Sequence, residues 1–189
     1  DVAVLANPRQ LSRGRALLPQ VAAVLSYYGG LVDDFPYPSF TLALVDHELP
    51  GGHSPAYFAL LHQPLPTTPY MWRNDPVHFD EFPQFFLAHE LAHQFWGQAV
   101  GWKSYHEQWI SEGFAQYFAL LYAERHAGPD VLRSVLARMR STALTWGNQG
   151  PVTLGYRLGH VKGDSRVFRA VVYNKSAVTL HMLRRIIGD

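Results

Sequence analysis

The sequence predicts an α+β fold, with a small mixed β-sheet followed by a mainly helical lobe. Two short runs rich in apolar and β-forming residues, 40–46 and 56–62, predict strands in the first third of the chain. Apolar residues at helical spacing precede these runs and dominate the chain after residue 80. Because the order is one helix, then strands, then helices, the pattern favours α+β.

The composition is that of a globular protein. The chain has 189 residues, of which 48% are hydrophobic and 16% are charged, so it can bury a sizeable core. The formal net charge of +1 gives no reason to expect a nucleic-acid or acidic-membrane partner. Cysteine is absent, which excludes disulfides and thiolate metal ligands. No signal peptide is visible, and no stretch has the roughly 20 apolar residues that span a bilayer.

The first element is predicted as a helix over 15–28. Its apolar residues recur at helical spacing: Leu17, Leu18, Val21, Val24, Leu25 and Tyr28. Pro19 is compatible with this helix only in the first turn. Gly29 and Gly30 predict its end.

The two predicted strands are expected to lie beside each other. The stretch 47–55 between them is rich in glycine and proline and predicts a turn, so 40–46 and 56–62 are expected to pair in antiparallel fashion. A proline-rich surface loop is expected at 63–76.

The rest of the chain is predicted to be mainly helical. Apolar periodicity and terminal Gly and Pro residues predict helices over 80–97, 109–128 and 129–146. The stretch 147–165 is expected to be a loop, with room for a short strand. A last helix is expected over 174–187.

Two histidines and a glutamate interrupt an otherwise apolar stretch, LAHELAHQFWG (87–97). At 3.6 residues per turn, His89 and His93 lie one above the other on one helix face. Two imidazoles at this spacing can share one zinc ion, and Glu90 is placed to reach a water molecule without ligating the metal. The apolar flanks argue against a solvated helix face, because buried ionisable groups must be paired or ligated.

A catalytic zinc ion has three protein ligands and one open position. Glu112, in WISEGFA (109–115), is the candidate for the third ligand, and 112 − 93 − 1 = 18 residues separate it from His93. That length allows one helix to end, a loop to pass and a second helix to return. On its own, Glu112 would be an ordinary glutamate in a first helical turn.

These residues resemble a known family. HELAH, 18 residues and then WISEGFA are similar to the zinc aminopeptidases related to membrane alanyl aminopeptidase and leukotriene hydrolase. FPYPSFTLALV (35–45) resembles a strand segment of that family, although the family's lysine is absent, and VVYNKSAVTLHML (171–183) resembles its Y-x-K-G-A segment. The resemblance implies a thermolysin-like catalytic domain, without the family's flanking amino-terminal and carboxy-terminal domains.

The resemblance also implies roles for single residues. His89, His93 and Glu112 would bind one zinc ion per chain, and Glu90 would be the general base. Tyr173 would donate a hydrogen bond to the developing oxyanion; the alternative is a core tyrosine with a satisfied hydroxyl.

Weaker candidates lie in the loops and near the last helix. Glu107 is either a carboxylate that orients a ligand histidine or a surface glutamate. His106 and His160 are expected to be solvated. Lys175 matches the family segment, and Ser176 replaces its glycine.

One departure concerns substrate binding. The family's exopeptidases carry G-x-M-E-N before the strand that lines the cleft, and its glutamate binds the substrate's free amino group. Here the stretch reads GGHSPAYF, so Gly51, Gly52 and His53 are the candidates for substrate contact and no glutamate is present. Asp46 and Glu48 are close in sequence but are expected to be solvated.

The sequence therefore predicts a zinc metallopeptidase, with aminopeptidase as the best single label. The alternatives are an endopeptidase or peptidase of altered selectivity, a catalytically silent scaffold, and a structural zinc site, which would need a fourth ligand. Residues 1–189 are expected to form one catalytic domain from a longer chain, with a helix and sheet part at 1–65 and a helical zinc-binding part at 78–189. The expected partners are a peptide or protein substrate and further domains of the same chain.

Overall fold

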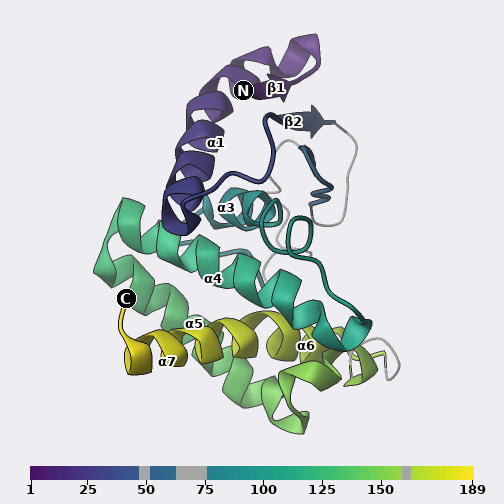
Figure 1. The fold of residues 1–189 in the computed structure, drawn as a ribbon, viewed down its shortest axis with the longest axis vertical. Coiled ribbons are helices and arrows are strands. Elements are labelled where there is room, and N and C mark those ends of the chain that lie inside the picture. The colour runs from purple at the N-terminus through teal and green to yellow at the C-terminus, as the bar shows by residue number, and fades with distance from the viewer. Residues whose placement is uncertain (47–51, 63–75, 159–162) are drawn as a thin grey trace.

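The computed structural model describes residues 1–46, 52–62, 76–158 and 163–189 (Figure 1). The strands and α-helices follow in the order β1 (Val2–Leu5), α1 (Leu11–Val32), β2 (Phe40–Val45), β3 (Phe58–His62), α3 (Phe85–Ala92), α4 (Gln108–Ala127), α5 (Pro129–Trp146), α6 (Ser165–Phe168) and α7 (Ser176–Ile187). Short 3₁₀-helices lie at Pro8–Gln10, Tyr105–Glu107, Gly147–Gln149 and Val152–Leu154. Within these ranges, no helix has the length and apolarity needed to cross a membrane.

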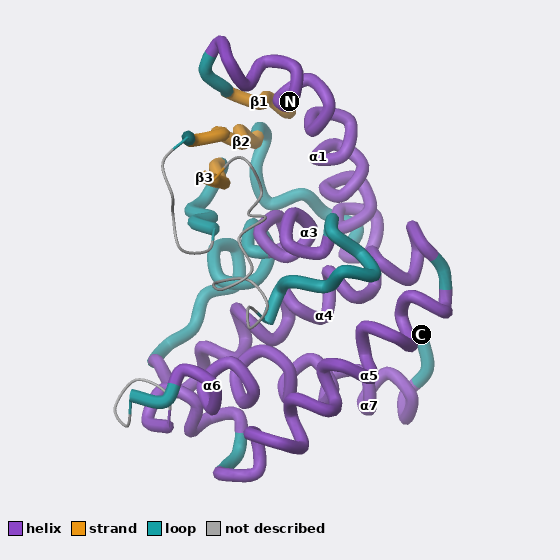
Figure 2. The backbone as a smooth tube through the Cα atoms, turned by 180° about the vertical axis from the view of Figure 1, so that it is seen from behind, coloured by secondary structure: helices purple, strands orange, loops and turns teal. Residues whose placement is uncertain are grey.

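The predicted organisation, a small sheet and a mainly helical remainder, is confirmed. The sheet and α1 lie at one end of the molecule and α4, α5, α6 and α7 at the other, with α3 between them (Figures 1 and 2). The helix α3 is therefore in a position to contact both parts, and it packs against α1 and α4.

The direction of strand pairing differs from the prediction. The described strands form a three-stranded sheet in the order β1–β2–β3, and both pairs are parallel. β2 and β3 are neighbours, as expected, but the prediction of antiparallel pairing is wrong. The chain reverses twice between them: His53 already pairs antiparallel with Leu60, and a second reversal follows at Tyr57, whose φ is +68°. β3 therefore runs in the same direction as β2. The pattern did not predict β1.

The first helix is longer than predicted. α1 begins at Leu11 and continues through Gly29 and Gly30 to Val32. Pro19 therefore lies inside the helix rather than in its first turn. Pro19 is exposed, so water can solvate the carbonyl group that a proline at this position leaves without its helical hydrogen bond.

The helix that carries the two histidines is shorter than the predicted 80–97. α3 has 8 residues, and all of them are buried. The turns on both sides contain hydrogen bonds between residues three apart, such as Phe85 N to Phe82 O and Phe95 N to Ala92 O. The hydroxyl of Tyr28 on α1 donates to the carbonyl of Ala88 at 3.0 Å, which fixes α3 against the first helix.

The helices α4 and α5 confirm the predictions at 109–128 and 129–146 within one residue at each end. The predicted last helix differs in its first turns. The π-helical segment Arg169–Lys175 precedes α7 and joins it to α6. In the described part of 147–165, the chain forms 3₁₀ turns and a short helical stretch at 155–158, and no strand.

Candidate active site

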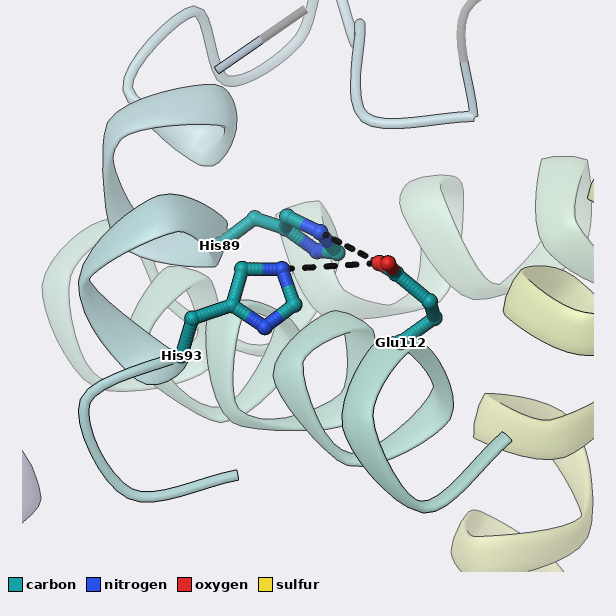
Figure 3. Close-up of side chains that lie close together, drawn as sticks. All are labelled: His89, His93 and Glu112. Carbon is teal, nitrogen blue, oxygen red and sulfur yellow. Dashed lines mark ion pairs between the residues drawn. The ribbon is translucent and has the colours of Figure 1, made fainter. Parts of the chain in front are cut away.

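The structure brings three predicted metal ligands together. His89 lies on α3, His93 is the residue that caps this helix, and Glu112 lies in the second turn of α4 (Figure 3). Nε2 of His89 lies 3.3 Å from Oε2 of Glu112, and Nε2 of His93 lies 3.4 Å from the same oxygen. One ligand atom from each residue lies within 4.8 Å of the others.

This arrangement fits a zinc ion. Two atoms that are each about 2.0–2.1 Å from a tetrahedral zinc ion lie about 3.3 Å apart, which matches both distances to Glu112. Oε2 of Glu112 is buried and has no hydrogen-bond partner among the described residues. Two imidazoles and one carboxylate are a donor set of catalytic zinc sites, and three protein ligands leave one position open.

The imidazole of His93 is held by the turn that follows α3. Its Nδ1 lies 3.0 Å from the carbonyl oxygen of Trp96 and 3.2 Å from the hydroxyl of Ser111. A proton on Nδ1 satisfies these acceptors, and Nε2, which faces Glu112, is then the ring nitrogen available to a metal ion. Gly97, at φ +117°, allows this close turn, since a Cβ there would contact the Ser111 hydroxyl.

The charged groups of the cluster favour a cation in the space between the side chains. Burial opposes a charged His93, but the carboxylates of Glu112 and Glu90 outweigh it and raise the pKa of His93 to about 9. Burial likewise opposes a charged Glu112, yet the two imidazoles hold the pKa of this carboxyl well below its usual range. The carboxylate of Glu112 is therefore ionised at neutral pH and available to a cation.

Glu90 lies beside the cluster and does not belong to it. Its carboxylate is not in the three-residue group, although the residue directly follows His89. Glu90 is 6% exposed. Oε2 of Glu90 accepts a hydrogen bond from the hydroxyl of Ser54 at 2.5 Å. A Cβ atom on Gly52 would collide with the Glu90 carboxylate in its present position, so the lack of a side chain at position 52 leaves room for this carboxylate.

The 52–58 segment is anchored to the chain that follows His93. Gln94 is fully buried, and its amide nitrogen donates to the carbonyls of Pro55 at 3.0 Å and Phe58 at 3.3 Å. Its amide oxygen accepts from the backbone N–H of Tyr57 at 2.9 Å. Sequence reasoning predicted neither the contact of Ser54 with Glu90 nor the role of Gln94. A buried amide inside the apolar run HQFWG was the available signal for Gln94.

Tyr173 is also brought to the cluster. It lies on the π-helical segment Arg169–Lys175, and its ring stacks on His89 with centroids 5.8 Å apart and planes 18° apart. π-Helical turns are frequently found at functional sites. The neighbouring Lys175 has a structural contact instead: its ammonium group donates to the carbonyls of Gly147 and Gly150 at 2.9 and 2.8 Å.

The candidates for substrate contact differ in their surroundings. Gly52 packs on Glu90, as described above. His53 is exposed and exchanges two backbone hydrogen bonds with Leu60. Gly51 lies outside the described residues, as does Glu48. Asp46 is exposed and accepts a hydrogen bond from Gln10.

The remaining loop candidates have other contacts or lie outside the described residues. The carboxylate of Glu107 accepts from the backbone N–H groups of Lys103 and Ser104 at 2.7 and 3.2 Å, so it caps the turn before α4. This contact supports the surface reading rather than a role in orienting a ligand histidine. His106 is exposed and contacts the carbonyl of Thr153. His160 lies outside the described residues.

Comparison with known proteins gives consistent matches. A family model described as the peptidase family M1 domain matches residues 83–189. Aminopeptidase Ey from Gallus gallus is 35% identical over 107 residues, which cover 51% of this chain and 10% of that protein. Aminopeptidase N from Homo sapiens is 32% identical over 111 residues, covering 54% of this chain and 11% of that protein. The matched part is thus about a tenth of the length of these relatives.

Solved structures show a similarity in fold over a longer part of the chain. A mutant of the M1 zinc metallopeptidase from Deinococcus radiodurans aligns with a TM-score of 0.59 and 22% identity, over 90% of this chain and 33% of that one. The wild-type enzyme from the same organism aligns with a TM-score of 0.55 and 23% identity, over 90% of this chain and 32% of that one. The likeness in fold therefore extends beyond residues 83–189, which the family model matches.

Proposed function

The chain belongs to peptidase family M1, and on that premise we propose that it carries the catalytic site of a zinc-dependent aminopeptidase. The observation that supports this most strongly is the cluster of His89, His93 and Glu112 with Glu90 directly beside it. A metal site that only stabilises the fold has four protein ligands, and the described residues supply three. A silent scaffold would have no physical need for a buried glutamate at position 90.

His89, His93 and Glu112 would hold the zinc ion. When bound, zinc supplies Lewis acidity towards a peptide carbonyl and towards a water molecule. The low pKa of the Glu112 carboxyl keeps an anionic ligand available at neutral pH. The contact of His93 Nδ1 with the Trp96 carbonyl keeps the other ring nitrogen free for the metal.

Glu90 would act as the general base. Its carboxylate accepts a proton from the attacking water and passes it to the amine that leaves. The side chain is nearly excluded from solvent. Glu90 is not one of the three proposed zinc ligands, so its carboxylate remains available for proton transfer.

We also propose one catalytic unit of thermolysin-like arrangement over residues 1–189, with the helix and sheet part at 1–65 and the zinc-binding helices within 78–189. The wide structural likeness to M1 metallopeptidases supports this assignment. The substrates would be peptides or proteins, and the greater length of the relatives agrees with further domains in the complete protein.

A metal-exchange experiment tests the proposal. Treatment of the complete protein with a chelator should abolish hydrolysis of an amino-acyl amide, and one equivalent of zinc should restore it. Hydrolysis that persists in the metal-free protein would contradict zinc-dependent catalysis.

Tyr173→Phe should lower kcat by about a hundredfold and change KM little, because an oxyanion hydrogen bond forms mainly in the transition state. The stacking of Tyr173 on His89 supports this role. Steady-state kinetics of the variant provide the measurement. Tyr27→Phe is a matched control, because it removes a hydroxyl that donates to the Leu121 carbonyl, away from the three candidate ligands. An unchanged kcat for Tyr173→Phe would identify Tyr173 as a packing residue.

A peptidase with altered selectivity is the second candidate, and the 52–58 segment favours it. No carboxylate stands in this segment, and the hydroxyl of Ser54 is already bonded to Glu90. A carboxylate that faces the substrate's ammonium group contributes about 1.5–3 kcal/mol. Without it, the protein lacks one source of discrimination against substrates with a blocked amino terminus.

We therefore expect the preference for a free amino terminus to be about one to two decades weaker than in relatives with the glutamate. The measurement compares kcat/KM for an amino-acyl amide and its N-acetylated twin on the complete protein. A preference of many decades would mean that another carboxylate binds the amine, and Glu48 would be the first to replace.

A further inference from the structure

Among the described residues, Ser54 is the hydrogen-bond donor to the Glu90 carboxylate, at 2.5 Å from Oε2. Glu90 is 6% exposed, so little water is available to replace this bond. A buried carboxylate without hydrogen bonds is costly. The bond to Ser54 therefore has more effect on Glu90 than the same bond would have at the surface.

The Ser54 hydroxyl has a fixed place because its backbone is tied on both sides. The carbonyl of Ser54 accepts from the Gln98 amide at 3.0 Å. The next residues are bonded to the buried amide of Gln94, and the preceding residue, His53, is bonded to Leu60. Gln94 and Gln98 follow His93 closely in the chain, so Ser54 is tied to the segment that carries a metal ligand.

The backbone geometry at Tyr57 shows how firmly this segment is held. Tyr57 has φ +68°. This conformation is energetically unfavourable for residues other than glycine. The N–H of Tyr57 donates to the Gln94 amide oxygen, which lies in the core. Contacts of this kind keep an unfavourable conformation in place and so fix the path of the 52–58 segment.

A carboxylate at the end of a glutamate side chain rotates easily, because the last torsion angle has a broad, two-fold preference. Gly52 covers the Glu90 carboxylate closely, and Ser54 holds Oε2. Together they restrict this rotation. Oε1 is then the oxygen that remains for proton transfer.

We propose that Ser54 is a positioning residue for the general base: its hydroxyl holds one oxygen of Glu90 so that the other takes the proton of the attacking water. This inference rests on the proposed function of Glu90. Ser54 acts through Glu90 and needs no contact with the substrate. Its contribution should therefore appear in kcat and not in KM.

The experiment compares Ser54→Ala and Ser54→Thr in the complete protein. Ser54→Ala should lower kcat about tenfold, with KM and zinc content unchanged, because the base loses its fixed orientation. Ser54→Thr keeps a hydroxyl and should restore most of the rate. Ser134→Ala is the matched control: it removes a serine–glutamate hydrogen bond of 3.1 Å to Glu81 at the surface, and kcat should not change.

Three results would overturn the proposal: an unchanged kcat in Ser54→Ala, a change confined to KM, or equal losses in the Ala and Thr variants. In the background of Glu90→Gln, Ser54→Ala should have no further effect on kcat. A full tenfold loss there would mean that Ser54 does not act through Glu90.

A crystal structure of Ser54→Ala gives a readout that does not depend on activity. The Glu90 carboxylate should rotate or split between two orientations. If it keeps a single, unchanged orientation, Ser54 does not position it. Failure of the proposed function is recognised separately, since wild-type protein and Glu90→Gln would then have equal rates.

Discussion

Glu90→Gln should reduce peptide hydrolysis by about 10²–10⁴-fold, the usual contribution of a general base. An amide has nearly the same shape as a carboxylate, but it cannot accept the proton of a water molecule. Zinc content should remain at one ion per chain, because Glu90 is not in the ligand cluster. The measurements are kcat with an amino-acyl amide and elemental analysis of the purified complete protein.

Glu107→Gln is the control for this variant. Glu107 caps the turn before α4 through backbone N–H groups, which a glutamine oxygen can also accept. We expect its rate to match that of the wild type. Equal rates for Glu90→Gln and wild type would refute the general-base role.

His89→Ala should lower zinc affinity by more than about a hundredfold, since even a residue that only orients a ligand contributes 10–100-fold. In the proposed site, the imidazole of His89 offers one of the three candidate ligand atoms, and its loss leaves a carboxylate and one histidine. Equilibrium dialysis against buffered zinc, followed by elemental analysis, gives the affinity.

Because His89 is 2% exposed, its replacement also leaves a cavity in the core. His93→Ala, at a site with 12% side-chain exposure, provides a second ligand variant with less effect on packing. His106→Ala, on the surface, is the control and should keep its zinc. Full zinc occupancy in both ligand variants at low free zinc would mean that the metal lies elsewhere.

The zinc-ligand candidates could be predicted from the sequence because their arrangement is set by local geometry. The four-residue spacing of His89 and His93 places them on one side of any helix, whatever its neighbours are. Glu112 needed one further step, a second helix that returns to the first, and the resemblance to the zinc aminopeptidases supplied its position. The boundaries of α4 confirm that helix.

The pairing direction of the strands could not be predicted in the same way. Periodicity along 40–46 and 56–62 identifies strands, but it contains no information about how the intervening chain travels. The antiparallel contact of His53 with Leu60 reverses the chain just before β3. A turn pattern rich in glycine and proline fits one reversal and two reversals equally well.

The contacts of Ser54 and Gln94 were missed for a related reason. Ser54 meets Glu90 from 36 residues away in the sequence, and Gln94 meets Tyr57 from 37 residues away. Loops have no hydrophobic period from which such contacts could be inferred. Only the fold brings the 52–58 segment across the end of α3.

The number of residues in the π-helical segment Arg169–Lys175 is constrained by the contacts on its two sides. The segment places Tyr173 on His89 while Ser176, at its end, packs directly on Gly113 of α4. The Ser176 hydroxyl donates to the Val171 carbonyl at 3.1 Å, which satisfies an acceptor in this wider turn. Each residue of a helix turns the chain by about 100°, so the deletion of one residue here would rotate Tyr173 away from His89 or α7 away from α4. We expect homologous chains to insert and delete residues freely in surface loops and to keep the residue count of this segment constant.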